Sequence, residues 1–161
     1  MTFRTYDKLN KEKRLIEHIA ANLSCQNREE ARLLFPGIPL RVLITAQADN
    51  TERGFALFSA KGEPCGIGGV FADGTIWFVV TQDAPEKLCI SWFKQTRKWL
   101  NDLHEIHHRI EGYCWVRNTL SQEWMKFMGF DFAPADSRAN KEVEGEKFLY
   151  FMRTPVCASR K

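Results

Sequence analysis

Residues 66 to 130 hold three unlike patterns in a fixed order, and that order constrains the fold more than any other feature. Apolar runs on both sides of the turn Lys61-Gly62-Glu63-Pro64 predict a β-hairpin. An amphipathic pattern from about Pro85 to His107 predicts a long helix. An apolar run ending at Asn118 predicts another strand, and a short helix follows it, with Gly129-Phe130 at its C-cap. Because a long helix between two strands is a crossover, parallel pairing is possible in this sheet.

Chain length and composition indicate one folded domain that spans residues 1–161, and the order of the predicted elements makes it an α/β domain. The chain is 44% hydrophobic and 12% aromatic, which is typical of a packed core rather than of disorder. No apolar run reaches the roughly 18 residues of a membrane span, and the N-terminus lacks the apolar segment of a signal peptide. We therefore expect a cytoplasmic protein with no membrane span.

The charge balance argues against a nucleic-acid-binding protein, and the cysteine content argues against a disulfide-linked one. The formal net charge is only +3, and the 23 basic residues are mixed with 20 acidic ones, so nucleic acid is not an expected partner. The five cysteines form no CxxC pair, and their number is odd. We expect reduced thiols that are mostly buried.

The remaining elements are predicted from local patterns. Phe3–Tyr6 reads as a strand, Asp7 as the cap of a helix, and Asn27 with Glu30 as a capping box. The segment from Pro39 to Gln47 fits either a helix or a strand. Other expected elements are a hairpin running from 55 to 71, a strand from 75 to 80, a loop or hairpin tip from 136 to 146, and a last strand from 147 to 153.

Taken together, these elements resemble the GNAT fold of acyl-CoA-dependent N-acetyltransferases. The matching segments are Cys65 to Phe71, Trp115-Val116-Arg117-Asn118, and the helix that ends Met125-Lys126-Phe127-Met128-Gly129-Phe130. The resemblance is strongest over residues 55–154. It implies a mixed, mostly antiparallel central sheet flanked by helices.

A narrower resemblance rests on three short motifs. Ile67-Gly68-Gly69, Trp77-Phe78-Val79 and Trp115-Val116 with Asn118 are similar to segments of the GNAT-like internal virion proteins of short-tailed bacteriophages. This resemblance implies phage virion or host proteins as partners, and a location in the host cytoplasm or in the virion.

The donor site that the GNAT resemblance implies is atypical. Active GNATs cradle the CoA pyrophosphate in a glycine-rich loop at a helix N-terminus, where free N–H groups favour anions. The matching segment, Val80 to Lys87, has no glycine, and Asp83 fits the N-cap of the helix better than a phosphate site. If acetyl-CoA binds, we expect the backbone of Phe78, Val79 and Val80 to hold the pantetheine arm. Thr81, Gln82 and Lys87 are then expected to hold the phosphates.

The resemblance also leaves catalysis without an obvious acid. Met125 occupies the position at which many GNATs carry a tyrosine, and a thioether has no proton to donate. Asn118 is the best remaining candidate, either positioning substrate or donor or capping the following helix. A base could come from Glu63, Asp73 or a chain of waters.

His104-Glu105-Ile106-His107-His108 matches the HExxH pattern of zinc proteases. The motif falls in the last turn of the predicted helix, where histidines also complement the helix dipole. No third ligand stands out, so we expect no metal. No Gly-x-Ser-x-Gly motif is present to indicate a serine hydrolase.

Two functions remain open from the sequence. The first is a phage-type, catalytically degenerate GNAT-like protein that acts in virion structure or assembly, or by binding protein partners. The alternative is an acetyl-CoA-dependent N-acetyltransferase with an atypical donor loop.

Overall fold

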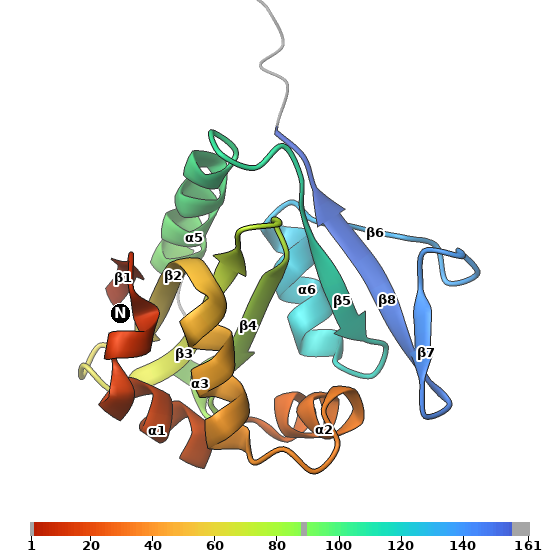
Figure 1. Ribbon diagram of the computed structural model, residues 1–161. Helices are drawn as coiled ribbons and strands as arrows, with labels where there is room; N and C mark the ends of the chain where they lie inside the picture. The colour runs from red at the N-terminus through yellow and green to blue at the C-terminus, as the bar shows by residue number, and fades with distance from the viewer. Residues whose placement is uncertain (1, 88–89, 156–161) are drawn as a thin grey trace, which may run out of the picture.

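The computed structural model describes residues 2–87 and 90–155, which form two four-stranded sheets with helices packed around them (Figure 1). The first sheet is antiparallel throughout and follows the order of the sequence. Its strands are β1 (Thr2–Tyr6), β2 (Thr51–Phe58), β3 (Pro64–Phe71) and β4 (Ile76–Val80).

The second sheet has the order β5-β8-β6, and β7 also pairs with β8. Each of these pairs is antiparallel. The strands are β5 (Ile110–Trp115), β6 (Asp131–Phe132), β7 (Lys141–Val143) and β8 (Glu146–Arg153). The predicted last strand is confirmed. The segment from 136 to 146, expected to be a loop or hairpin tip, includes the tip of the β7–β8 hairpin and also the short strand β7 itself.

The two sheets meet where β4 and β5 begin. The N–H of Glu111 donates to the carbonyl of Gly74 at 3.1 Å, and Thr75 and Glu111 form a parallel bridge. Beyond this bridge the strands spread apart (Figure 1). We call the gap between them the splay. The structure therefore shows the predicted mixed, mostly antiparallel α/β architecture.

Helices cover both faces of the first sheet because its apolar side chains alternate. Phe55, Leu57 and Val70 pack on one face with the long helix, and Ala56 and Ile67 pack on the other with the first and third helices. The helical elements are η1 (Leu9–Lys11), α1 (Lys13–Ala21), α2 (Cys25–Leu34), α3 (Leu40–Asn50), α4 (Ala84–Lys87), α5 (Ile90–Leu103) and α6 (Thr119–Phe127).

Several predicted helix ends needed correction. Asp7 does not cap the first helix, because η1 intervenes and Glu12 is the N-cap of α1. The N-cap of α2 is Ser24, whose Oγ accepts the N–H of Asn27 at 3.2 Å, so Asn27 is not the cap. The segment after Pro39 is a helix rather than a strand.

The predicted long helix ends earlier than its apolar repeat, which continues to His107. Helix α5 ends at Leu103, while His107 lies beyond it and is buried. Residues 88–89, inside the predicted helix, lie outside the described part of the chain, as does Cys157. Cys65 and Cys114 are buried, as expected for most of the cysteines, and Cys25 is exposed. None of the helices described is long and apolar enough to cross a bilayer.

Candidate functional site

Every second residue of β4 points its backbone N–H and C=O groups away from β3 and into the splay. Phe71 N–H donates to Thr75 O, and Thr81 N–H donates to Cys65 O, both at 2.9 Å. In an antiparallel pair, successive residues point their N–H and C=O groups alternately toward the partner strand and away from it. Phe78 and Val80 therefore point their N–H and C=O groups into the splay, whereas Val79 points its own toward β3. Of the three residues expected to hold a pantetheine arm, two have suitably directed backbone.

The backbone groups of Val80 that point into the splay are already hydrogen-bonded to residues near the start of α2. The N–H of Val80 donates to Asn27 Oδ1 at 3.0 Å, and its carbonyl accepts the N–H of Ser24 at 2.9 Å. One step further, Gln82 N–H donates to Asn22 O at 2.9 Å. Residues 22–24, which we call the connector, thus pair with the end of β4 as a short added strand, with Leu23 opposite Thr81.

On the other side of the splay, the end of β5 is hydrogen-bonded to Glu30, one turn after Asn27 on helix α2. Glu30 Oε1 accepts the N–H of Trp115 at 2.6 Å, and Glu30 Oε2 accepts Asn118 Nδ2 at 2.9 Å. Residues three apart lie on one face of a helix, so Asn27 and Glu30 reach β4 and β5 respectively from the same side of α2. Helix α2 therefore spans the open end of the splay.

Asn118 caps the following helix, as one of its two expected roles requires, and its expected role toward substrate or donor stays a prediction. Its side-chain oxygen accepts the N–H of Ser121 at 3.3 Å and so caps α6, while its amide nitrogen donates to Glu30. The residue is only 2% exposed. The structure therefore brings Asn118 to the edge of the splay, with both ends of its side chain engaged.

Burial raises the pKa of the Glu30 carboxyl above its usual range. The hydrogen bonds from Trp115, Asn118 and Asn27 favour the ionised form and offset part of this rise. The carboxyl is therefore better suited to bridging α2 and β5 than to attracting a cation from solvent.

This pKa predicts a pH dependence of stability. A raised folded-state pKa means that the native state binds the proton more tightly, so Glu30 favours folding below the ordinary glutamate pKa of about 4.3. That contribution is lost as pH rises through the raised value. Urea unfolding of the wild type and of Glu30→Gln between pH 4 and 8 should show the wild type losing stability relative to the variant as pH rises. A constant difference would contradict the assignment, and His104, whose pKa burial lowers, cancels because both proteins contain it.

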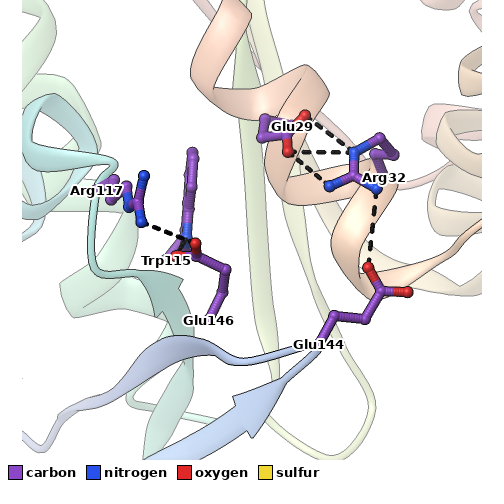
Figure 2. Close-up of polar contacts among 6 residues, drawn as sticks. All are labelled: Glu29, Arg32, Trp115, Arg117, Glu144 and Glu146. Atoms are coloured by element: carbon purple, nitrogen blue, oxygen red, sulfur yellow. Dashed lines mark hydrogen bonds and ion pairs between the residues drawn. The ribbon is translucent and has the colours of Figure 1, made fainter.

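Two groups of polar contacts lie near the outer face of α2, one around Arg32 and one around Glu146 (Figure 2). Arg32 lies 3.7 Å from the carboxylate of Glu144, in the turn between β7 and β8. Glu146 accepts the indole N–H of Trp115 at 3.0 Å and pairs with Arg117 at 2.9 Å. The Arg32–Glu144 pair joins α2 to the second sheet, whereas the contacts of Glu146 tie β8 to β5 and to the loop after it. Exposed ion pairs add little stability, so we expect the Arg32–Glu144 pair mainly to orient α2.

The predicted phosphate segment is also engaged with its own neighbours. Thr81 Oγ1 donates to Asp83 Oδ1 at 2.6 Å, and Gln82 Oε1 accepts the N–H of Cys25 at 2.9 Å. Asp83 directly precedes α4, which is only four residues long. Lys87 is the last residue of α4, and its side chain lies outside what the structure describes. This segment does not fit the glycine-lined anion cradle of the GNAT pattern, because Asp83 places a carboxylate there.

The candidate acid and bases lie in different parts of the molecule. Met125 is buried on α6 and lines the cavity between β4 and β5. Asp73 lies in the β3–β4 turn, at the end of β4 away from Val80, and the bond from Thr75 N–H lowers its pKa. Glu63 lies in the β2–β3 turn, beside Gln82 and Asp83. Neither acidic residue faces the gap between Phe78 and Trp115.

The HExxH residues do not converge on one point. His104 Nδ1 bonds to the backbone carbonyl of His107 at 2.9 Å, and His107 Nε2 lies 3.1 Å from Glu52 Oε2. Within the part of the chain that is described, no group of three or more His, Cys, Asp or Glu residues is placed to hold a metal ion. These histidines close the turn after α5.

A cavity of about 260 Å³ occupies the splay. It is bounded by β4, β5, α2, α3 and α6, and most of its lining is apolar. The two edges of the splay and this cavity form the candidate site.

No protein-family model matches this chain, and no curated protein matches it. Solved structures do. A GNAT-family acetyltransferase from Bacillus anthracis superposes with a TM-score of 0.62 at 12% identity, over 96% of this chain and 95% of that one. A ribosomal-protein-S5-alanine acetyltransferase from Vibrio fischeri gives 0.61 at 10% identity, over 99% and 97%. A spermidine N-acetyltransferase from Vibrio cholerae, in complex with CoA and spermine, gives 0.55 at 17% identity, over 95% and 94%.

The chain has the GNAT fold. The resemblance drawn from the order of sequence motifs is confirmed at that level, and identities this low show the fold alone. The narrower resemblance to internal virion proteins stays a prediction, because none of the three structures named is a virion protein. The residues expected to hold acetyl-CoA on this GNAT fold likewise remain predictions.

The roles of Asn27 and Glu30 in the splay were missed from the sequence. Both were assigned to a capping box, which uses the same three-residue spacing. Their actual partners, Val80 and Trp115, lie 53 and 85 positions away. No local pattern points to such partners.

Proposed function

We propose that this chain is a GNAT-fold protein that acts by binding a protein partner, with its donor site closed by its own connector and α2. The observation that carries the proposal is the hydrogen bonding of Val80. Its N–H and C=O both point into the splay, and both are bonded to residues of the connector and α2. A pantetheine arm would have to displace Asn27 and Ser24 to pair there.

Two further features support loss of acyl transfer. The turn from Thr81 to Asp83 offers a carboxylate where a pyrophosphate would sit. Met125 stands where a GNAT tyrosine would supply a proton, and general acid catalysis contributes roughly 10²–10⁴-fold to such reactions. The partner we propose is a phage virion or host protein, in the virion or the host cytoplasm, and this part rests on the sequence resemblance alone.

A second candidate is an acetyl-CoA-dependent N-acetyltransferase with an atypical donor loop. The solved structures support this candidate more than they support a role in a virion, because those named above are acetyltransferases. The cavity in the splay also supports it, since such a gap could admit an acceptor. Phe78 and Asn118 would then face the donor, and the connector would have to leave β4.

Calorimetric titration with acetyl-CoA, with CoA as a parallel ligand, separates the two candidates. We expect no saturable heat and no thermal shift at millimolar donor, because the peptide groups of Val80 are already paired. Saturable one-site binding in the micromolar range, followed by acetylation of an amine, would overturn the closed-site proposal and establish the second candidate.

A further inference from the structure

The cavity in the splay is large enough for a small organic molecule. Its volume is about 260 Å³, whereas an engineered apolar cavity of about 150 Å³ binds benzene. The walls include Leu34, Leu43, Ile44 and Phe78, from two helices and β4. An apolar body filling this space would gain contacts that an empty cavity lacks.

Asn27 and Glu30, two polar side chains of the cavity wall, are already hydrogen-bonded to other groups of the chain. Asn27 accepts from Val80, and Glu30 accepts from Trp115 and from the side chain of Asn118. Neither side chain is free to fix the charged end of a ligand. The interior therefore favours an apolar group, and any charged end must remain at the rim.

The rim carries a cation. Lys141, on β7, lines the cavity, and its Nζ lies 4.3 Å from the ring centroid of Tyr113 and 5.7 Å from that of Phe148. Among the side chains that the structure describes, no carboxylate forms an ion pair with this ammonium group. A lysine held over aromatic rings at the mouth of an apolar cavity is placed to pair with an anionic head group.

We propose that this cavity binds a small carboxylate with an apolar body. The body occupies the splay between β4 and β5, and the carboxylate pairs with Lys141 at the rim. This ligand class differs in sign from the amine that an acetyltransferase would accept, and the proposal does not depend on the protein partner proposed above.

Three probes of equal chain length test the sign of the head group: octanoate, octanol and octylamine, each titrated by calorimetry into the intact protein. We expect octanoate to bind most tightly and octylamine least. Lys141→Gln should weaken octanoate binding about tenfold, the effect of losing one charge-assisted bond, and leave octanol binding unchanged.

Two more variants locate the binding. Lys126→Gln is the matched control, because Lys126 makes a similar contact at 5.7 Å with the ring of Phe132 but does not line the cavity. It should bind all three probes as the wild type does. Ala31→Leu, which fills the cavity from α2, should weaken octanoate and octanol alike.

Three results would overturn the proposal: octylamine binding more tightly than octanoate, octanoate binding that is unchanged in Lys141→Gln, or no binding of octanoate and octanol. The first of these would instead support an amine acceptor at the same cavity, as the second candidate function requires.

Discussion

Replacing Glu30 with alanine should cost the fold about 2 to 5 kcal/mol, because it leaves two buried donors unpaired at roughly 1 to 3 kcal/mol each. These donors are the N–H of Trp115 and the amide nitrogen of Asn118, both of which donate to Glu30 in the native structure. For a chain of this size the loss corresponds to a fall in Tm of roughly 5 to 15 °C. Thermal and urea unfolding of the purified variant measure it directly.

Glu29→Ala is the matched control for this experiment. Glu29 is the preceding residue of α2 and pairs with Arg32 at 2.7 Å, with both side chains largely exposed. Exposed pairs of this kind contribute about 0 to 1 kcal/mol, so this variant should remain close to the wild type. Equal losses in Glu29→Ala and Glu30→Ala would mean that the bridge from α2 to β5 does not stabilise the fold.

Glu30→Gln separates the hydrogen bonds from the charge. The glutamine keeps one oxygen that can accept from Trp115 or Asn118, and it removes the buried charge whose unfavourable environment raises the pKa of Glu30. We therefore expect its stability at neutral pH to lie well above that of Glu30→Ala. A glutamine variant as unstable as the alanine variant would show that both acceptor oxygens are required.

Elements that depend on local periodicity were predictable from the sequence. The apolar repeat of α1, the Gly129 C-cap region after α6 and the alternation along β8 all depend on residues close in the chain. The end of α5 was not predictable in this way. The apolar stripe of the predicted helix extended to His107, and this residue is indeed buried. It lies, however, in the turn after α5, where its ring contacts Glu52, and not in a further turn of the helix.

The candidate site was predictable only in outline. The resemblance located the edge of β4 near Phe78 and Val80, and the strand end at Asn118. It could not show that Asn27 and Ser24 hydrogen-bond to the backbone of Val80. Residues of these types form helix caps and long-range hydrogen bonds alike, so the local pattern does not distinguish the two. Long-range pairing of this kind depends on how α2 docks against two strands, which no sequence window contains.

Gly68→Ala should destabilise the fold by about 3 kcal/mol, at the upper end of what overpacking usually costs. An added Cβ would lie 2.6 Å from the carbonyl oxygen of Trp77 and 2.8 Å from Cζ of Phe55. The carbonyl belongs to the neighbouring strand and cannot move without disturbing β4. The Phe55 ring is held by Trp99, whose ring centroid lies 4.9 Å away. The glycine therefore reflects the close approach of a neighbouring carbonyl and an aromatic ring to this strand.

Gly66→Ala, two residues earlier on the same strand, is the control for this substitution. Its Cβ would meet Leu57 Cδ1 and Val80 Cγ1 at 3.1 Å and Val79 O at 3.2 Å. Side-chain methyl groups can shift by a few tenths of an ångström, so we expect a loss of about 1 kcal/mol. Urea unfolding of the two variants tests the difference. If Gly68→Ala is no less stable than Gly66→Ala, the Phe55 ring can move away from β3, and the packing that places β4 beside the splay is looser than the contacts of Gly68 require.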